Sequence, residues 1–308
     1  MAIQPPLLQA GDTIGIVTLG SPIDERTAKE RIITLESMGF NVVLGEHTFS
    51  QNGFLAGSNE ERAEDFMGMI RNEEVKMILP SRGGVGVAGI LPYLDFEVIQ
   101  NNPKIVTGYS DITVLINALY EFSNLITFHS LMLIDFRVST PAYNFNQFYT
   151  AVSTTQAPRT IDNPPGLPLV SLVEGNVTGP LVGGNLTSFA GLLGTEYEVS
   201  TSGKIIFLEE TNEPSNTVYR YLKQLEMAGK FDDCLGIVMG ECTGCPVSYG
   251  VSYNEVVEDF LAPIGKPLIT GLASGHGLFK AAVPIGAEIN LNADDGVLTI
   301  LESNVSLP

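Results

Sequence analysis

Short apolar runs alternate with amphipathic segments through the first half of the chain. The apolar runs have the length of buried strands, and the amphipathic segments repeat their apolar residues with the period of a helix. Strands are predicted at residues 13–18, 41–44, 75–79, 105–107 and 125–128, and helices at residues 24–38, 58–72 and 111–120. Strand and helix in alternation form parallel βαβ units, so the pattern predicts an α/β domain built on a doubly wound parallel sheet.

Two of these helices have recognisable ends. Gly39 follows the first helix and can adopt the left-handed conformation that terminates a helix. Ser58 and Glu61 begin the next helix with a capping box, in which each side chain bonds the backbone amide of the other residue. Both signals support the predicted boundaries.

The pattern changes near the middle of the chain. Residues 153–168 contain four prolines and no apolar period, which is typical of a connection between domains. We therefore expect an N-terminal domain over residues 1–152, a linker over 153–170 and a C-terminal domain over 171–308.

The C-terminal part is expected to be richer in antiparallel strand. Strands are predicted at residues 204–208 and 235–239, and helices at residues 213–228 and 253–261. A terminal hairpin is predicted from Asp295-Gly296, because this dipeptide favours a tight turn between two strands.

Length and charge narrow the function classes. The 308 residues are about twice the usual domain size, which agrees with two domains. The chain has 16 basic and 35 acidic residues, a net charge of −19, and no basic cluster, so nucleic acid is excluded as a partner.

The first residues lack the features of a secretory signal, and no run reaches the ~18 apolar residues of a membrane span. We expect a cytoplasmic protein with no membrane partner.

Three cysteines are too few for a disulfide framework in a chain of this length. Cys242 and Cys245 have the spacing of half a zinc site, but no second pair of ligands stands at a matching spacing. They could also form a redox pair, although no thioredoxin-like helix start is recognisable there. We interpret them as a structural or incidental pair and expect neither a metal nor a cofactor.

Ser110 lies where an apolar strand stops and a helix is predicted to start. Such a turn lifts a hydroxyl out at the carboxyl edge of a parallel sheet, as in the nucleophile elbow of serine hydrolases. The elbow motif G-x-S-x-G is incomplete, because Ile112 occupies its last position. A serine ahead of a helix also commonly caps that helix. The local pattern therefore leaves two roles open for Ser110, nucleophile and helix cap.

A nucleophilic serine needs a base, and the chain contains three histidines. His276 stands between two glycines on a turn that can present the imidazole to a neighbouring domain, and it is the first candidate. His129 follows a strand and is the second candidate, whereas His47 lies in a polar segment typical of the surface. Each of them could equally be a hydrogen-bonded structural histidine.

An orienting carboxylate is the third requirement of such a site. Glu209 and Glu210 directly follow the predicted strand 204–208. Adjacent side chains of an extended segment point to opposite sides, so only one of the two can face the site. The alternative is a pair of solvated charges in a loop.

A tetrahedral intermediate also requires amide donors for its oxyanion. The glycine-rich segment 81–86 follows a predicted strand, so we expect the amide of Gly84 or Val85 to form the oxyanion hole together with that of Asp111. Such a turn could instead cradle a phosphate, but its spacing matches neither common nucleotide-binding pattern.

In this order along the chain, these motifs resemble those of the LD-carboxypeptidase family of serine peptidases, which includes the microcin C immunity peptidases. The likeness covers nearly the whole length. It rests on Gly11-Asp12-Thr13-Ile14-Gly15-Ile16, Arg82-Gly83-Gly84, Leu91-Pro92-Tyr93-Leu94-Asp95, Asn102-Pro103-Lys104, Gly108-Tyr109-Ser110-Asp111-Ile112-Thr113, Thr127-Phe128-His129, Gly183-Gly184-Asn185-Leu186, Phe207-Leu208-Glu209-Glu210 and Gly275-His276-Gly277.

The resemblance implies a fold and a site. The fold is a flavodoxin-like or class I amidotransferase-like N-terminal domain and a β-rich C-terminal domain, with the active site in the cleft between them, in a homodimer. The family's catalytic triad falls on Ser110, Glu209 and His276. A carboxypeptidase also holds the free carboxylate of its substrate, for which Arg82 is the candidate, with a structural ion pair as its alternative role.

The resemblance also implies hydrolysis of an amide bond in a small peptide. The muropeptide branch removes the terminal D-alanine of a tetrapeptide in cell-wall recycling, and Arg82-Gly83-Gly84 favours this branch. Residues 91–96 favour the microcin immunity branch, which cleaves aminoacyl-nucleotide or peptide conjugates. Val85, Gly89 and Ser130-Leu131 depart from the family pattern near the expected substrate. A hypothesis of another class is a non-catalytic protein that binds a small ligand in the cleft.

Overall fold

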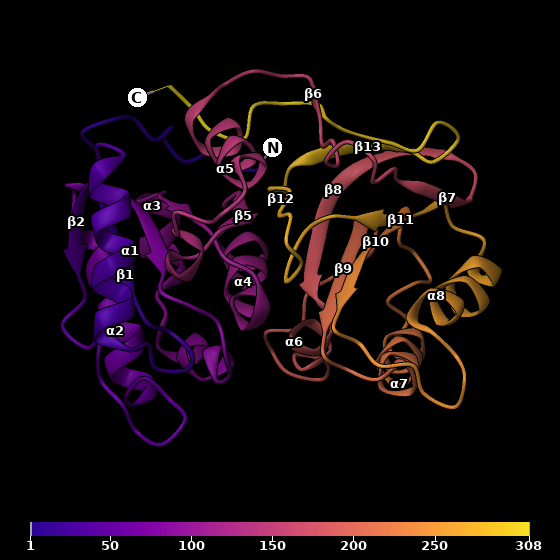
Figure 1. Cartoon of the computed structure of the whole chain (residues 1–308), viewed down its shortest axis with the longest axis horizontal. Coiled ribbons are helices and arrows are strands. Elements are labelled where there is room, and N and C mark those ends of the chain that lie inside the picture. The colour runs from indigo at the N-terminus through magenta and orange to yellow at the C-terminus, as the bar shows by residue number, and fades with distance from the viewer. Residues whose placement is uncertain (1, 308) are drawn as a thin grey trace.

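The computed structural model of the chain describes residues 2–307, which form two domains lying side by side (Figure 1). The N-terminal domain contains a four-stranded parallel sheet with the order β2-β1-β3-β4. Its strands are β1 (Thr13–Val17), β2 (Asn41–Leu44), β3 (Val75–Pro80) and β4 (Ile105–Val106). The parallel α/β sheet expected from the alternating pattern is confirmed.

Helices flank this sheet. Helix α1 (Glu25–Ser37) begins after a cap at Asp24, and α2 (Asn59–Arg71) begins with the predicted capping box of Ser58 and Glu61. The remaining elements of this half are η1 (Val87–Tyr93), α3 (Phe96–Asn101), η2 (Ser110–Ile112), α4 (Thr113–Ser123), β5 (Thr127–His129), η3 (Leu133–Asp135) and α5 (Ala142–Ser153). The helix expected from residue 111 starts only at Thr113, because the chain first makes a tight 3-10 turn.

The C-terminal domain is built on an eight-stranded mixed sheet with the order β6-β14-β13-β8-β9-β10-β11-β7. It is β-rich as expected, but its four central strands, β8 to β11, run parallel, and only the flanking strands are antiparallel. The strands are β6 (Arg159–Thr160), β7 (Val170–Val173), β8 (Asn176–Asn185), β9 (Ile205–Thr211), β10 (Gly236–Thr243), β11 (Leu268–Leu272), β13 (Glu288–Asn292) and β14 (Val297–Ile300). The predicted turn at Asp295-Gly296 joins the last two.

Helices connect the parallel strands of this sheet. They are α6 (Leu186–Ala190), α7 (Ser215–Met227) and α8 (Tyr253–Leu261), the last extended by η4 (Ala262–Ile264). Parallel strands need such crossovers, and this explains why helices alternate with strands here as they do in the first half. Within residues 2–307 no helix has the length and apolar character needed to cross a bilayer.

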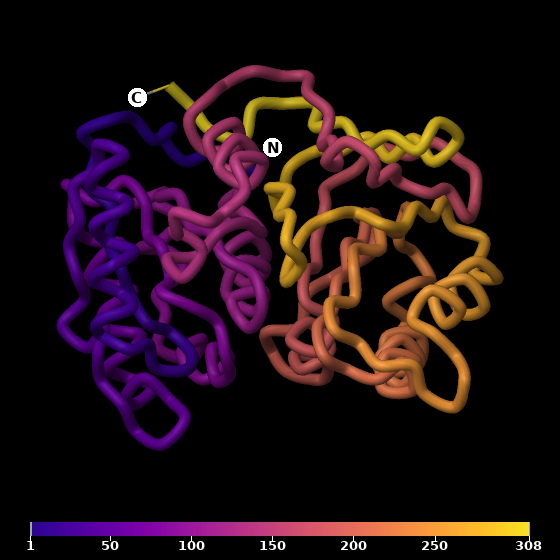
Figure 2. The backbone as a smooth tube through the Cα atoms, in the orientation of Figure 1, coloured from indigo at the N-terminus to yellow at the C-terminus, as the bar shows by residue number. Residues whose placement is uncertain are grey.

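Several contacts hold the two domains together. Strand β5 pairs with β12 (Val283–Ile285) in a separate two-stranded sheet, which places His129 opposite Val283. The Asn117 side chain on α4 accepts from the Gly183 amide and donates to the Gly183 carbonyl, both at 2.8 Å. The end of the chain returns to the N-terminal domain, where Ser306 forms a bridge with Pro6 (Figure 2).

The hydrophobic core is also shared. One buried apolar cluster runs through the N-terminal domain and continues into the C-terminal sheet, where it includes Phe207, Val238 and Ile269. A second cluster, with Leu222 and Val257, lies between that sheet and its helices α7 and α8. Separating the domains would expose apolar surface to water, so packing fixes the two halves of the cleft relative to each other.

Candidate active site

Ser110 occupies a strained turn after the carboxyl end of β4. Its φ angle is +61°, in the left-handed region that residues other than glycine rarely adopt. Such strain is typical of a nucleophile elbow, in which the turn exposes the side chain. The cap residue of η2 is Tyr109, and the Ser110 hydroxyl makes no hydrogen bond within residues 2–307. Of the two roles that the sequence leaves open, the helix cap is not formed.

Two glycines make room for this turn. A Cβ atom on Gly108 would lie 2.5 Å from the side chain of Ile112. A Cβ atom on Gly83, in the loop after β3, would lie 2.9 Å from Ser110 Oγ and 3.1 Å from the Asp111 amide nitrogen. Real Cβ contacts are not that short, so the loop backbone packs directly against the candidate nucleophile because residue 83 is a glycine.

His276 and Glu209 are hydrogen-bonded to each other in the C-terminal domain, with 2.9 Å between Nδ1 and Oε2. Glu209 is on β9 with its side chain 1% exposed, and His276 is on the turn after β11 with its side chain 17% exposed. The turn approaches the carboxylate closely at Gly275, where φ is +95° and a Cβ atom would lie 2.2 Å from Oε2. Because the ionised carboxylate accepts from Nδ1–H, Nε2 of His276 is left to take up a proton.

Glu210 points to the other side of β9, as the alternation of an extended strand predicts. Its carboxylate accepts from the Asn185 side chain at 3.0 Å, from the Thr187 amide and hydroxyl at 2.9 and 2.6 Å, and from the Thr211 amide at 2.8 Å. Glu210 therefore anchors the start of α6, whereas Glu209 faces the histidines.

Lys280 fixes the turn that carries His276. Its buried Nζ donates to the carbonyls of Gly275 at 2.5 Å and Gly277 at 3.0 Å, and lies 4.4 Å from the centroid of the Tyr109 ring. The Tyr109 ring meets the His276 ring edge-on, with their centroids 5.0 Å apart. The serine turn of one domain and the histidine turn of the other thus meet at Tyr109.

The charge state of the Glu209–His276 pair follows from its surroundings. Burial alone raises the pKa of the Glu209 carboxyl, but contacts with His129 and His276 outweigh burial and hold this pKa at about 2. Glu209 is therefore ionised at neutral pH and can stabilise an imidazolium at His276. Burial lowers the pKa of His129, whose side chain is 0% exposed. The second candidate base is neutral and enclosed.

Ser110, Glu209 and His276 all lie at the boundary between the domains, but Ser110 and His276 are not hydrogen-bonded to each other. Within residues 2–307, neither Ser110 Oγ nor His276 Nε2 makes a hydrogen bond. Catalytic hydrogen bonds commonly tighten only when a substrate binds. His47 lies away from this site, with its Nδ1 3.8 Å from Glu61 Oε1.

The predicted oxyanion donors come from two segments: Gly84 and Val85 from the loop after β3, and Asp111 from η2. The Val85 amide donates to Ser21 Oγ at 3.3 Å, and a Cβ atom on Gly84 would lie 2.3 Å from the same oxygen. The Val85 amide is thus engaged. Asp111 also ties the loop to η2, because its carboxylate accepts from the Val87 amide at 2.8 Å.

Arg82 is exposed on the same loop. Its Nη1 lies 3.5 Å from the Pro22 carbonyl oxygen, and within residues 2–307 no carboxylate pairs with it. The structural ion pair considered as its alternative role is therefore not formed.

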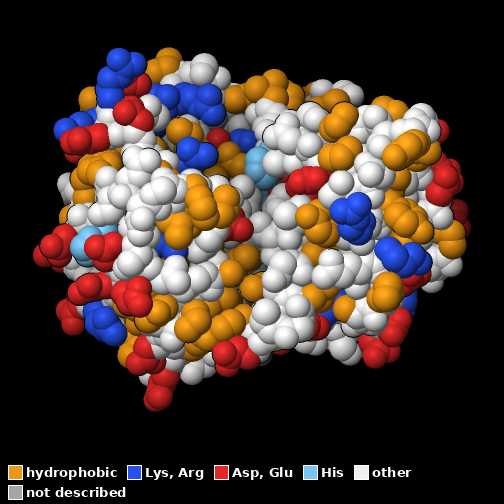
Figure 3. Space-filling model, turned by 90° about the horizontal axis from the view of Figure 1, so that it is seen from below, with side chains coloured by type: hydrophobic (Ala, Val, Ile, Leu, Met, Phe, Trp, Pro, Cys, Tyr) orange, Lys and Arg blue, Asp and Glu red, His pale blue; other side chains and the backbone are white. Residues whose placement is uncertain are grey.

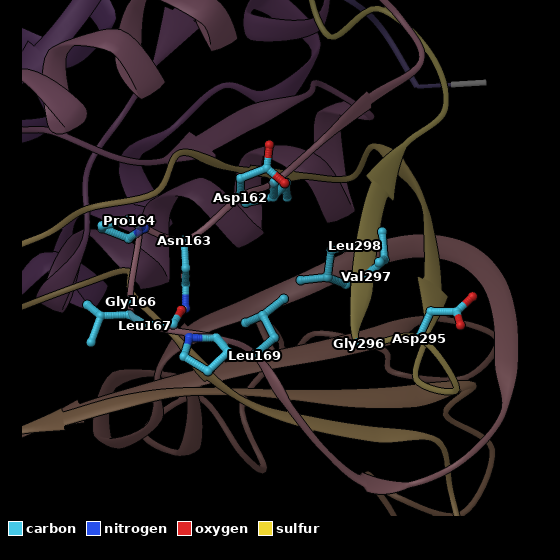
Figure 4. Close-up of a pocket in the computed structure, with 12 residues that line it drawn as sticks. Asp162, Asn163, Pro164, Gly166, Leu167, Leu169, Asp295, Gly296, Val297 and Leu298 are labelled. Carbon is cyan, nitrogen blue, oxygen red and sulfur yellow. The ribbon is translucent and has the colours of Figure 1, made fainter.

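The surface is hollowed between the two domains, and a histidine is visible in the hollow (Figure 3). A groove of about 720 Å³ lies beside the His276 turn, where Glu241, Gly277 and Leu278 line it. A separate cavity of about 480 Å³ lies between the segment 161–169 and the β13–β14 hairpin (Figure 4). None of the predicted site residues lines this second cavity.

Cys242 and Cys245 form a disulfide, with their Cα atoms 5.5 Å apart. Cys242 lies within β10, which extends beyond its predicted end, and both cysteines line the groove beside the His276 turn. The third cysteine, Cys234, is free and buried, and burial raises the pKa of its thiol to about 11. The pair is a local crosslink between the end of β10 and the loop that follows it.

Three residues of the site were not predicted from the sequence. Tyr109 directly precedes Ser110, and Gly83 stands in the glycine-rich segment 81–86, so these two motifs were the available signal. Lys280 has no such signal, because its partners are backbone carbonyls and a ring that only the fold brings together.

Known proteins match the chain over nearly its whole length. The family model described as the LD-carboxypeptidase N-terminal domain matches residues 14–130, and that of the C-terminal domain matches residues 178–291. The probable murein peptide carboxypeptidase of Bacillus subtilis (strain 168) is 36% identical, covering 98% of this chain and 95% of that protein. The microcin C7 self-immunity protein MccF of Escherichia coli is 28% identical, covering 98% and 97%.

Solved structures agree with these matches. MccF in complex with aspartyl sulfamoyl adenosine has a TM-score of 0.93 at 25% identity, covering 99% of this chain and 100% of that one. Muramoyltetrapeptide carboxypeptidase from Oxalobacter formigenes has a TM-score of 0.82 at 26% identity, covering 96% and 99%. The class that the fold and these matches define is a two-domain carboxypeptidase of the serine type. The chain belongs to the LD-carboxypeptidase family.

Proposed function

We propose that the protein hydrolyses the amide bond between an L-configured centre and the terminal D-alanine of a muropeptide tetrapeptide. The observation that carries the proposal is the Glu209–His276 hydrogen bond at the domain boundary, where the His276 ring meets the ring of Tyr109, the residue before the strained Ser110. The 36% identity to a probable murein peptide carboxypeptidase, against 28% to MccF, favours a muropeptide as substrate.

Ser110 is the proposed nucleophile. Its hydroxyl oxygen bonds to the carbonyl carbon of the scissile amide, while its proton passes to Nε2 of His276. The amides of Gly84 and Asp111 stabilise the oxyanion of the tetrahedral intermediate, and the Val85 amide joins them if it releases Ser21.

His276 next acts as an acid. It returns the proton to the nitrogen of the D-alanine, the carbon–nitrogen bond breaks, and D-alanine leaves as the free amino acid. A water molecule then attacks the ester at Ser110 and gives a proton to His276. His276 passes this proton to the Ser110 oxygen as the carbon–oxygen bond breaks, and the shortened peptide leaves with a new carboxylate. Glu209 remains ionised throughout and holds His276 in the tautomer that has its hydrogen on Nδ1.

Arg82 is the proposed partner of the substrate's terminal carboxylate. Its guanidinium is exposed next to Gly83, and it lacks an acidic partner within residues 2–307. A guanidinium can bind a carboxylate through two parallel hydrogen bonds, which an ammonium group cannot do. Arg82→Lys should therefore raise KM more than it lowers kcat.

The test compares two substrates in parallel. We expect release of D-alanine from a muropeptide tetrapeptide, and we expect Ser110→Ala to abolish it. Faster cleavage of an aminoacyl sulfamoyl adenosine would instead support the microcin immunity branch, which the TM-score of 0.93 to MccF favours. Binding of either compound without turnover would support the non-catalytic binding protein.

A homodimer and a cytoplasmic location belong to the same proposal. Both come from the sequence and the family resemblance. Light scattering on the purified chain should give twice the mass of one chain, and cell fractionation should recover the activity with cytoplasmic markers. A monomer with full activity would contradict the dimer.

A further inference from the structure

Among the described residues 2–307, the Glu209 carboxylate accepts a hydrogen bond through one oxygen only. Oε2 accepts from His276, whereas Oε1 is buried without a hydrogen-bond partner and lies 3.8 Å from Nε2 of His129. Nε2 of His129 is itself buried without a partner. A buried polar atom without a partner is destabilising, and here an unpartnered acceptor and a nitrogen able to donate face each other.

We propose that His129 is a positioning residue for Glu209. Its Nε2–H faces Oε1 of Glu209 and thereby keeps Oε2 hydrogen-bonded to His276. This inference rests on the proposed function, in which Glu209 orients the catalytic base. At 3.8 Å the contact is electrostatic, and a shift of about 0.6 Å would bring it within hydrogen-bond range.

The tautomer of His129 follows from its neighbours. An ionised carboxylate only accepts, so the hydrogen of a neutral ring lies on Nε2, towards Glu209. Nδ1 then accepts from the hydroxyl of Ser274, whose Oγ is 3.2 Å away. The same hydroxyl donates to the Ala281 carbonyl oxygen, 2.9 Å away, when Nδ1 of His129 carries a hydrogen. It has one hydrogen to give, so in the tautomer with hydrogen on Nε2 it turns from Ala281 to Nδ1. Burial lowers the pKa of His129 and so favours the neutral arrangement.

The ring of His129 has little freedom to move. Strand β5 is held by β12, and the ring meets Phe207 edge-on with centroids 5.1 Å apart. A Cβ atom on Gly184 would lie 3.0 Å from Cδ2 of the ring. A ring fixed in this way can hold a carboxylate in one orientation.

The titratable and charged groups around His129 come from three segments. They are Glu209 on β9, His276 and Lys280 in the segment between β11 and β12, and Tyr109 before η2, whose hydroxyl donates to Asp135. Of these, Glu209 has a terminal atom directly opposite Nε2 of His129. Removing the N–H of His129 should therefore make the Glu209–His276 pair take up a proton more readily.

The experiment compares His129→Asn with His129→Gln. The Gln amide nitrogen reaches the place of Nε2 and can donate to Oε1, whereas the shorter Asn amide reaches only the place of Nδ1. We expect His129→Asn to lower kcat about tenfold and to move the acid limb of the pH–rate profile up by about 0.5–1 unit. His129→Gln should restore the limb to within experimental error of the wild type.

His47→Gln is the matched control, because His47 also lies 3.8 Å from a glutamate oxygen but outside the site. A purely structural role for His129 would lower activity and melting temperature without moving the acid limb. An unmoved limb in His129→Asn, or equal shifts in the Asn and Gln variants, would overturn the proposal.

A second measurement does not depend on substrate. Nitrogen-15 histidine spectra of the Ser110→Ala protein, with and without His129→Asn, report the pH at which the Glu209–His276 pair takes up a proton. The proposal predicts the same upward shift there. An upward shift in a protein whose wild type cleaves no peptide would refute the proposed function and leave the role of His129 intact.

Discussion

The N-terminal domain contributes backbone shape to the candidate site, whereas the C-terminal domain contributes buried charge. Ser110 is half-buried in a turn with a strained φ of +61°, and the glycine at position 83 lets a loop pack against it. Glu209 and His276 are held instead by hydrogen bonds among buried polar atoms. A substitution that adds a methyl group should disturb the backbone around Ser110. A substitution that removes the carboxylate charge should disturb the Glu209–His276 pair, so different changes should inactivate the two halves of the site.

Removing the nucleophile should have the largest effect. Ser110→Ala should lower kcat by about 10⁴-fold, since only binding and the oxyanion donors then remain. D-alanine release measured by a coupled assay checks this. Ser37→Ala, on the exposed face of α1, is the matched control and should keep full activity. Retained activity in Ser110→Ala would mean that the strained turn has no part in the chemistry.

The neighbouring glutamates offer the sharpest test of the charged half. Glu209→Gln should lower kcat about 10³–10⁴-fold, because the amide cannot stabilise an imidazolium at His276. Glu210→Gln should keep kcat within about tenfold but lower the free energy of unfolding by about 1–3 kcal/mol, since it weakens the anchor of α6. Measuring kcat and the free energy of unfolding in urea for both variants checks these expectations. Equal losses of kcat would contradict the division between site and scaffold.

Adding one carbon tests the half that depends on shape. Gly83→Ala should lower kcat about 10²-fold, because the new methyl group would displace Ser110 Oγ or the Asp111 amide. Gly68→Ala on α2 is the control, since an added Cβ there meets no atom within 4 Å from the other described residues beyond its own helix turn. The melting temperature of Gly68→Ala should be unchanged or higher. If Gly83→Ala were fully active, the loop would not be part of the site.

The smallest effect is the pH dependence of stability. The pKa of Glu209 is about 2 in the folded protein, against an ordinary value of 4.5. Its ionisation therefore contributes fully to the free energy of unfolding above pH 4.5, and this contribution is lost as pH falls towards 2. The difference in unfolding free energy between the wild type and Glu209→Gln should shrink by at most about 1.4 kcal/mol per pH unit across this window. Burial raises the pKa of Asp111 in the other domain, so ionisation of Asp111 lowers the free energy of unfolding instead of raising it. Urea unfolding at pH 5, 4 and 3 checks the difference.

The elements of the fold were predictable because their signals are local. The capping box at Ser58, the terminal turn at Asp295-Gly296 and the strand 41–44 all lie where the pattern predicts them. The parallel centre of the C-terminal sheet was not predicted. Strand direction depends on which strands pair, and β8 and β11 contain glycines that break the apolar pattern on which a prediction relies.

By itself the sequence determined the α/β class, the alternation of strand and helix in the first half and the chemical types of the candidate residues, because periodicity and motifs are properties of neighbouring positions. The local pattern left Glu209 and Glu210 open and the family resemblance implied Glu209, but only the tertiary structure puts its carboxylate on His276, which is 67 positions away. It likewise decided that Gly83 lies against Ser110, that Lys280 holds the His276 turn, and that His129 lies behind Glu209. These contacts join segments that are remote in sequence, so they depend on how the two domains pack against each other.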